Sequence, residues 1–122
     1  MRGAKSKQVA RTVAKSVVCS NLLKAAIFGA DANWGRVLCA IGYSGAAVDV
    51  NKIGVAFVSA AGKIEVCEDG RGIDFSEAAA KKILSEKEIG IEIELHDGNY
   101  SSVGWGCDLT YEYVHINGDY RS

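Results

Sequence analysis

The 122-residue sequence has no proline, and it lacks any apolar run of about 18 or more residues, the length that a membrane-spanning helix requires. The first twenty residues carry charges where a secretory signal peptide has an apolar centre, so no signal peptide is expected in them. With 48% hydrophobic residues and no linker-like stretch, residues 1–122 are expected to form a single domain in the cytoplasm.

Neither sign of charge predominates, since 14 basic residues stand against 15 acidic ones. Nucleic-acid binding depends on a clustered basic face, so no nucleic-acid partner is expected. One basic cluster lies near the amino end, and its spacing favours the solvated face of a helix over a phosphate-binding patch. It consists of Arg2, Lys5, Lys7, Arg11 and Lys15.

Cysteine and histidine are few and widely spaced. The sequence has no Cys-x-x-Cys pair, and His96 and His115 lack metal-site spacing. We therefore expect small buried thiols instead of a zinc site or a disulfide framework, and no metal. The cysteines are Cys19, Cys39, Cys67 and Cys107.

Other familiar catalytic patterns are also missing. Residues 61–63 (AGK) lack the leading glycine and the following Ser or Thr of a phosphate loop. The glycines contain no dinucleotide-binding G-x-G-x-x-G pattern between a strand and a helix. Ser101, His96 and Asp97 could form a catalytic set on paper, but they are neighbours at a predicted hairpin tip, where a role in the turn is favoured.

Apolar spacings of three and four predict helices in the first part of the chain. Val9, Val13 and Val17 form the apolar stripe of an amphipathic helix. A second, short helix is expected between Ser20, which would cap its start, and Gly29, which would end it in the left-handed conformation.

Two further helices are predicted. One begins at Trp34, with either Asp31 or Asn33 as its capping acceptor, and stops at the glycines that follow residue 41. The other is the Ala-rich run FSEAAAKKIL, before which Asp74 and Glu77 resemble a capping arrangement.

After residue 50 the apolar period changes to two, which predicts strands. Residues 53–57 and 64–66 alternate on either side of a turn at Ala61-Gly62, as in a hairpin. Residues 89–95 alternate again, Asp97-Gly98 turns the chain, and residues 102–113 return as a strand. The prediction is an α+β fold, with amino-terminal helices followed by two β-hairpins and an intervening helix packed on a mainly antiparallel sheet.

Two stretches contain more polar side chains than the sequence around them. GADANWGR, residues 29–36, is read first as a structural unit in which a capped helix begins, with a ligand site as the alternative. The carboxyl end, INGDYRS, carries hydrogen-bonding side chains where a terminal tail is ordinarily disordered and without such groups. A tail of this composition can reach into a site, which need not be a site of this chain.

GADANWGR, together with WGCDLTYEYVHINGDYRS at residues 105–122, closely resembles the carboxyl-terminal part of ornithine acetyltransferase, also called glutamate N-acetyltransferase. AKSVVCSNLLKAAIF and VLCAIGYSG are similar to the same family, so the resemblance covers essentially the whole chain. It implies an enzyme of arginine biosynthesis that cleaves itself at an Ala-Thr bond. The freed threonine would carry acetyl from N-acetylornithine to glutamate without any cofactor.

The sequence departs from the family by omission. Its only threonines, Thr12 and Thr110, do not follow alanine in the family's cleavage motif. We therefore expect no catalytic residue here, an inactive fragment, and partners in the upstream α chain and the remainder of the β chain, within a heterotetramer. The start MRGAKS fits an initiator methionine at an internal position.

The resemblance carries over two substrate-binding residues. In the family an asparagine near the end and a final Thr or Ser bind the amino-acid substrate, and Asn117 and Ser122 stand at these positions. An amide and a hydroxyl each offer both donor and acceptor, which suits α-amino and carboxylate groups. GADANWGR is interpreted as a conformational signature that packs this domain against the catalytic part, and no direct substrate contact is assigned to it.

A second hypothesis comes from another class of function. The chain would then be a free-standing amino-acid-binding or regulatory module without catalysis. An upstream coding region with an Ala-Thr precursor motif would favour the acetyltransferase.

Overall fold

A computed structural model describes residues 1–104 of the chain. Four α-helices, one 3-10 turn and four strands follow one another there, and they confirm the predicted α+β class. In chain order they are α1 (Lys7–Val18), α2 (Asn21–Phe28), α3 (Trp34–Gly42), η1 (Val50–Lys52), β1 (Gly54–Ser59), β2 (Gly62–Glu68), β3 (Arg71–Gly72), α4 (Glu77–Leu84) and β4 (Gly90–Glu94).

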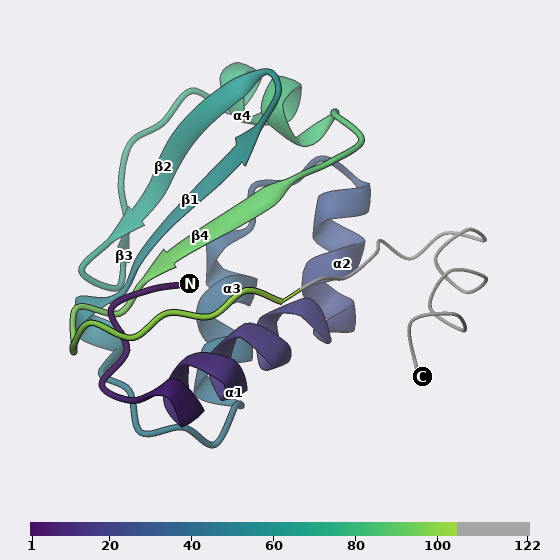
Figure 1. Ribbon diagram of the computed structural model, residues 1–122. Helices are drawn as coiled ribbons and strands as arrows, with labels where there is room; N and C mark the ends of the chain where they lie inside the picture. The colour runs from purple at the N-terminus through teal and green to yellow at the C-terminus, as the bar shows by residue number, and fades with distance from the viewer. Residues whose placement is uncertain (105–122) are drawn as a thin grey trace, which may run out of the picture.

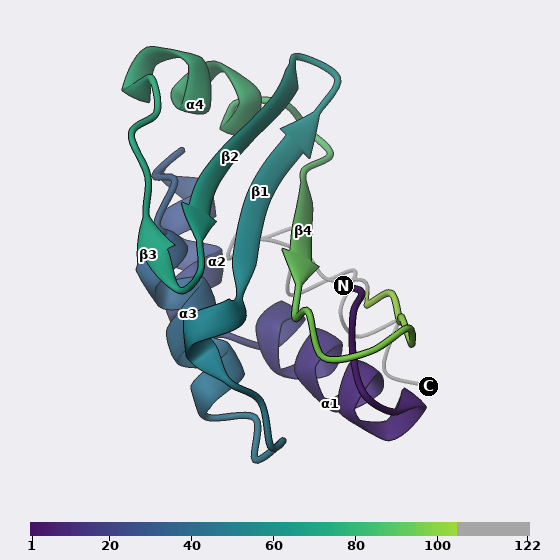
Figure 2. The same ribbon diagram turned by 90° about the vertical axis from the view of Figure 1, so that its left-hand side faces the viewer.

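The strands form one antiparallel sheet in the order β3-β2-β1-β4. The helices lie against one face of this sheet (Figures 1 and 2). Apolar residues of both layers meet there, including Val13 of α1, Ile41 of α3 and Phe57 of β1, each with no exposed surface. The opposite face is charged, and Lys63 bonds Glu92 across it at 2.8 Å.

The hairpin of β1 and β2 confirms the first predicted strand pair. Its turn lies one residue earlier than predicted, at Ala60 and Ala61, because Ser59 pairs with Gly62. Between Val55 and Ala56 the register shifts, so that two consecutive residues of β2, Val66 and Cys67, are both buried. A bulge of this kind interrupts the alternation that a regular strand would show.

Side-chain caps start the helices. Ser20 caps α2 as predicted, accepting a hydrogen bond from the Leu23 amide, and Ser6 caps α1 in the same way. The end of α2 differs from the prediction, because Gly29 has φ −84° and Ala30 takes the left-handed conformation at φ 55°. Bonds from Ala30 N to Ile27 O and from Asp31 N to Ala26 O identify this end as a Schellman motif.

The cap of α4 is also corrected. Ser76 accepts the hydrogen bond from the Ala79 amide at 3.1 Å, whereas the predicted capping arrangement began at Asp74. The hydroxyl of Ser76 directly precedes the helix, and the acidic Glu77 in the first turn adds a favourable interaction with the helix dipole.

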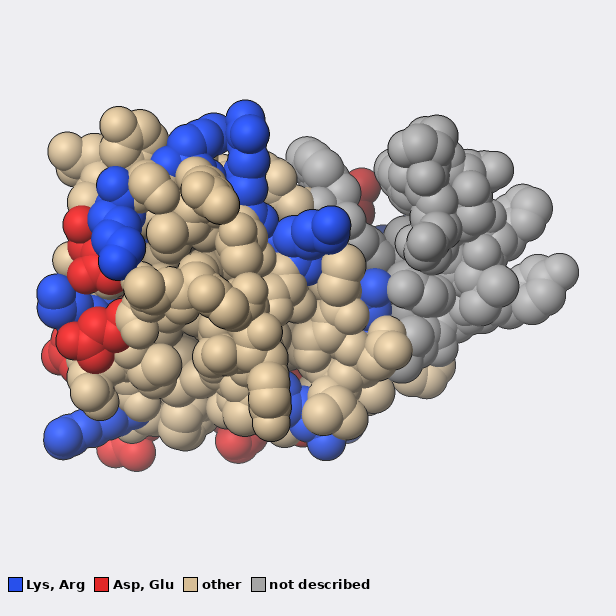
Figure 3. All heavy atoms as spheres, turned by 90° about the horizontal axis from the view of Figure 1, so that it is seen from below, with Lys and Arg blue, Asp and Glu red and all other residues tan. Residues whose placement is uncertain are grey.

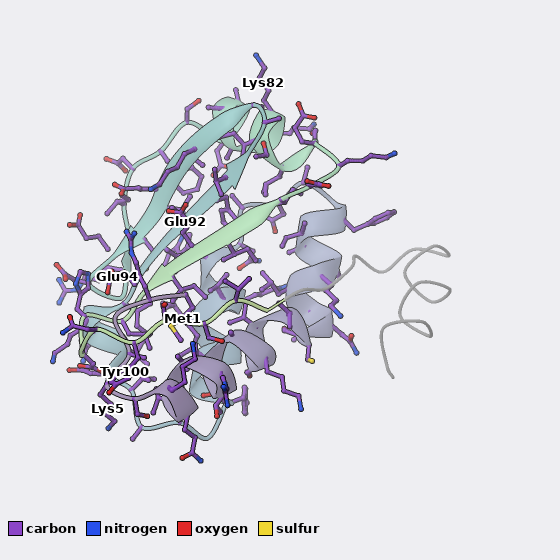
Figure 4. All side chains as sticks on the ribbon, in the orientation of Figure 1. Met1, Lys5, Lys82, Glu92, Glu94 and Tyr100 are labelled. Atoms are coloured by element: carbon purple, nitrogen blue, oxygen red, sulfur yellow. The ribbon has the colours of Figure 1, made fainter. Side chains whose placement is uncertain are left out.

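The chain after β4 does not pair directly with that strand in its described part. The first residues of the chain lie between β4 and the chain that follows it. Arg2 N donates to Ile93 O of β4, and Arg2 O accepts from the amide of Leu95, the residue after β4. Ala4 exchanges two hydrogen bonds with Tyr100. Figure 4 shows Met1 beside β4, and Tyr100, from the chain after β4, near Lys5. Most of the predicted return strand, residues 105–113, lies outside the described residues.

Trp34, the first residue of α3, packs against Gly72 of β3. A Cβ atom added at Gly72 would overlap carbon atoms of the Trp34 indole. The absence of a side chain at Gly72 therefore allows the start of α3 to approach the edge of the sheet.

We expect Gly72→Ala to lower the free energy of unfolding by about 1–3 kcal/mol, because the indole must move to admit a methyl group. Urea denaturation measures this change. Gly42→Ala is the matched control, since no atom of residues 1–104 beyond its own helix backbone and chain neighbours lies within 4 Å of a Cβ at this helical position. Equal losses for the two variants would contradict the packing role of Gly72.

Candidate functional site

The two predicted substrate-binding residues, Asn117 and Ser122, lie outside the described residues. The described chain ends at Gly104, and Gly104 lines a cleft of about 860 Å³. This cleft, here called the β4 cleft, lies between α1, α2 and β4. Its lining comprises Met1, Ala14, Val17, Val18, Leu23, Lys24, Ile27, Phe28, Ala30, residues 84–87, residues 89–91, Ile93, Val103 and Gly104.

The lining of the β4 cleft is predominantly apolar. Phe28 and Val103, which both line it, expose 62% and 71% of their surface. Charged lining residues come from α2, at Lys24, and from the segment after α4, at Glu86 and Lys87. Since burying apolar surface is favourable, such a cleft is suited to an apolar or amphipathic occupant.

The backbone of β4 adds hydrogen-bonding groups to one wall. In an antiparallel pair, alternate residues direct their N–H and C=O groups toward the partner strand. Ile93 O accepts from Arg2 N, so the groups of Ile93 and of Ile91 two residues earlier face away from β1. Among residues 1–104, no backbone hydrogen bond joins Ile91 to a segment outside the sheet.

In GADANWGR the polar side chains form local hydrogen bonds. Asn33 is the cap of α3, and its Oδ1 accepts from Arg36 N at 3.1 Å. Its Nδ2 donates to Asp31 Oδ2 at 3.3 Å, which links the loop to the helix start. Of the two predicted caps, Asn33 is therefore the one used.

The Arg36 guanidinium of the same motif joins two helices. Its Nη1 donates to the Leu22 carbonyl of α2 at 2.7 Å. Together with Trp34 against Gly72, these contacts give the motif a structural role and connect α2, α3 and the sheet.

The Ser-His-Asp neighbours also serve the local structure. Asp97 Oδ1 accepts from Lys52 Nζ at 3.1 Å, and the His96 amide donates to Glu94 Oε2. His96 has φ 57°, a left-handed conformation suited to the turn after β4. The Ser101 carbonyl accepts from Lys7 Nζ at 2.6 Å.

The cysteines differ from one another in exposure. Cys67 is buried as predicted, and burial raises the pKa of its thiol. Cys19 and Cys39 are exposed, so the prediction was wrong for them, and Cys107 lies outside the described residues. Over residues 1–104 no three His, Cys, Asp or Glu side chains come together as a metal site would require.

The basic cluster divides into two parts. Lys7, Arg11 and Lys15 lie exposed on α1, as predicted for a solvated helix face. Arg2 and Lys5 precede the helix, and Arg2 Nε bonds Glu94 at 2.8 Å. Figure 3 shows Lys and Arg side chains at several places on one face, with uncharged surface between them.

Comparisons with known proteins match the chain throughout. The model of the ArgJ family matches residues 1–122. The chain is 52% identical to the arginine biosynthesis bifunctional protein ArgJ 1 of Clostridium acetobutylicum, over 98% of this chain and 29% of that protein. It is also 52% identical to the ArgJ protein of Thermotoga neapolitana, over 100% of this chain and 31% of that protein.

A solved structure agrees with the fold. The crystal structure of the arginine biosynthesis bifunctional protein ArgJ from Bacillus halodurans superposes with a TM-score of 0.83 at 46% identity. The match covers 98% of this chain and 55% of that one. This chain belongs to the ArgJ family.

The ArgJ chain spans about 30% of the length of the relatives named above. In the described part of this ArgJ chain, no helix combines the length and apolar character that crossing a membrane demands.

The β4 cleft was not predicted from the sequence. The alternation of Ile89, Ile91 and Ile93 correctly indicated a strand with one apolar face. This alternation gave no indication that the edge of β4 that faces away from β1 would lie beside α1 and α2. That arrangement depends on contacts between residues far apart in the chain. The first four residues, MRGA, have no strand pattern, although Arg2 pairs with Glu94 of β4 and Ala4 pairs with Tyr100.

We expect Asn33→Ala to lower the free energy of unfolding by about 1 kcal/mol, because α3 loses its cap and the link to Asp31. Thermal and urea denaturation measure the change. Asn51→Ala is the control. Asn51 is exposed, and within residues 1–104 it is bonded only through its backbone amide, to Asp49, so its loss should stay within about 0.5 kcal/mol. If the two variants are equally stable, the motif does not depend on this cap.

Proposed function

We propose that this chain is the carboxyl-terminal, substrate-contacting part of a glutamate N-acetyltransferase, which moves acetyl from N-acetylornithine to glutamate in arginine biosynthesis. The complete enzyme would include an upstream α chain and the rest of the β chain, assembled as a heterotetramer. The match of the ArgJ family model to residues 1–122 is the observation that carries this proposal. The names of the relatives, which place them in arginine biosynthesis, support it.

The proposed chemistry is nucleophilic catalysis by a threonine hydroxyl. Its own terminal amine takes the hydroxyl proton as the oxygen attacks the acetyl carbonyl. The same proton then passes to the nitrogen of the substrate as the C–N bond breaks, and ornithine leaves as the amine. Glutamate's amine then attacks the acetyl-threonine ester and releases the hydroxyl. Hydrogen-bond donors around the developing oxyanion would stabilise both tetrahedral intermediates.

This chain would be inactive without the rest of the enzyme. Thr12 lies inside α1, where its nitrogen is part of a peptide bond and does not provide a terminal amine. Thr110 lies outside the described residues, and the residue before it is Leu109 instead of the alanine of the cleavage motif. The nucleophile would therefore come from the missing part.

Asn117 and Ser122 are the proposed substrate contacts in this chain. An amide and a hydroxyl supply donors and acceptors that match the charged α-amino and carboxylate groups of ornithine and glutamate. Hydrogen bonds to charged groups contribute about 1.5–3 kcal/mol, enough to matter for substrate affinity.

A chimeric enzyme tests the proposal. Residues 1–122 would replace the matching segment of the Thermotoga neapolitana protein, all of this chain being covered by that match. We expect acetyl transfer from N-acetylornithine to glutamate by the chimera and none by the 122-residue chain alone. In the chimera, Asn117→Ala and Ser122→Ala should each raise KM about tenfold or more.

The control variant is Asn51→Ala in the same chimera, because Asn51 is exposed and lies on the 3-10 turn. Its KM should stay unchanged. Turnover by the 122-residue chain alone would overturn the assignment of the nucleophile to the missing part. A folded chimera without activity would contradict the proposed function itself.

A further inference from the structure

The first residues of the chain act as a short strand at the edge of the sheet. Arg2 N donates to Ile93 O at 2.8 Å, and Leu95 N donates to Arg2 O at 3.0 Å. The bridge between Arg2 and Glu94 is parallel, so this segment runs in the same direction as β4. On its other side Ala4 pairs antiparallel with Tyr100.

A chain that extended residues 1–4 in the same direction, beyond Met1, would enter the β4 cleft. One wall of the cleft is the edge of β4 at Ile91 and Ile93, and Val103 and Gly104 belong to the chain that follows the opposite neighbour, Tyr100. Residues 1–4 fill the gap between the two chains, and Figure 1 shows the amino terminus between β4 and the chain that leads to Gly104. A strand that continued this segment beyond Met1 would therefore start between β4 and the chain that leads to Gly104.

Hydrogen-bond geometry defines how a further strand would fit. In a parallel ladder, one residue of a strand donates to and accepts from two residues of its neighbour that are two positions apart. Arg2 does this with Ile93 and Leu95. The next residue in phase is the one directly before Met1 in a longer chain. It would donate to Ile91 O and accept from Ile93 N.

The side chains of α1 and α2 beneath the proposed strand position favour a segment in which apolar and polar residues alternate. Val17 and Val18 of α1 and Leu23 and Ile27 of α2 line the cleft on the core side, whereas the other face of the sheet carries charged residues such as Glu92. A strand placed between them meets apolar surface on one face and water on the other, which suits apolar and polar residues in alternation.

We propose that the β4 cleft binds one extended segment, which runs parallel to β4. In a complete ArgJ protein this segment consists of the residues that directly precede the part corresponding to residues 1–122. The edge from Ile89 to Ile93 gives room for about five residues at about 3.3 Å each. The inference rests on the part of the proposed function that places this chain at the carboxyl end of a longer protein, and it requires no catalytic activity.

Amide hydrogen exchange in an extended chain tests the proposal. The roughly six residues that precede the matched segment of the Thermotoga neapolitana protein would be added before Met1 of the 122-residue chain. We expect the amides of Ile91 and Ile93 to exchange about tenfold more slowly than in the unextended chain, because both gain a hydrogen bond. The same six residues in scrambled order should give little protection.

Two exposed apolar residues of α2 provide matched variants. Phe28 lines the β4 cleft, and Leu22 does not; both are more than 60% exposed, so a charge at either position leaves the core intact. Phe28→Glu should remove most of the added protection in the extended chain. Leu22→Glu should preserve it.

Two results would overturn the proposal. Unchanged exchange at Ile91 and Ile93 on extension would mean that the segment does not occupy the cleft. Slow exchange at both amides before extension would mean another occupant: a second copy if sedimentation gives a dimer, or residues 105–113 if it gives a monomer. Neither result concerns acetyl transfer, which the chimera tests separately.

Discussion

The pairing of residues 1–4 with two other segments is the constraint on which this structure depends. Hydrogen bonds from Arg2 to the β4 side and from Ala4 to Tyr100 join the beginning of the chain to its last described part. The close approach requires glycine at position 3, where φ is +78° and a Cβ would overlap the Glu94 carboxylate and contact the His96 amide nitrogen. One short segment thus sets the position of α1, which follows it, relative to the sheet.

This pairing also relates the fold to the proposed function. Because Ser102 N donates to Met1 O, the chain that leads to Gly104 is held beside the β4 cleft. The proposed substrate contacts, Asn117 and Ser122, follow Gly104 in sequence. In our account the domain therefore has two tasks: its cleft packs against the preceding part of the enzyme, and its end supplies groups to the substrate.

Local features of the fold were predictable from sequence, and non-local ones were not. The cap at Ser20 and the first hairpin depend on residues close together in the chain, so their patterns are visible in sequence. The left-handed residue at the end of α2 was assigned to Gly29 instead of Ala30, since only the Schellman hydrogen bonds identify the position. For the candidate site, the polar composition of the tail drew attention to it, and the resemblance assigned substrate binding to Asn117 and Ser122. The cleft depends on pairing between the two ends of the described chain.

The stability of two glycine variants tests the central constraint most directly. Gly3→Ala and Gly45→Ala both place a side chain at a left-handed φ, +78° and +82°, which costs about 1–2 kcal/mol in each case. Within the described part of the chain, a new Cβ at Gly3 would overlap neighbouring atoms, whereas at Gly45 nothing lies within 4 Å of it. Urea denaturation should therefore show a loss for Gly3→Ala that exceeds the loss for Gly45→Ala by about 1–3 kcal/mol. Equal losses would show that the fold does not depend on the close pairing of its first residues.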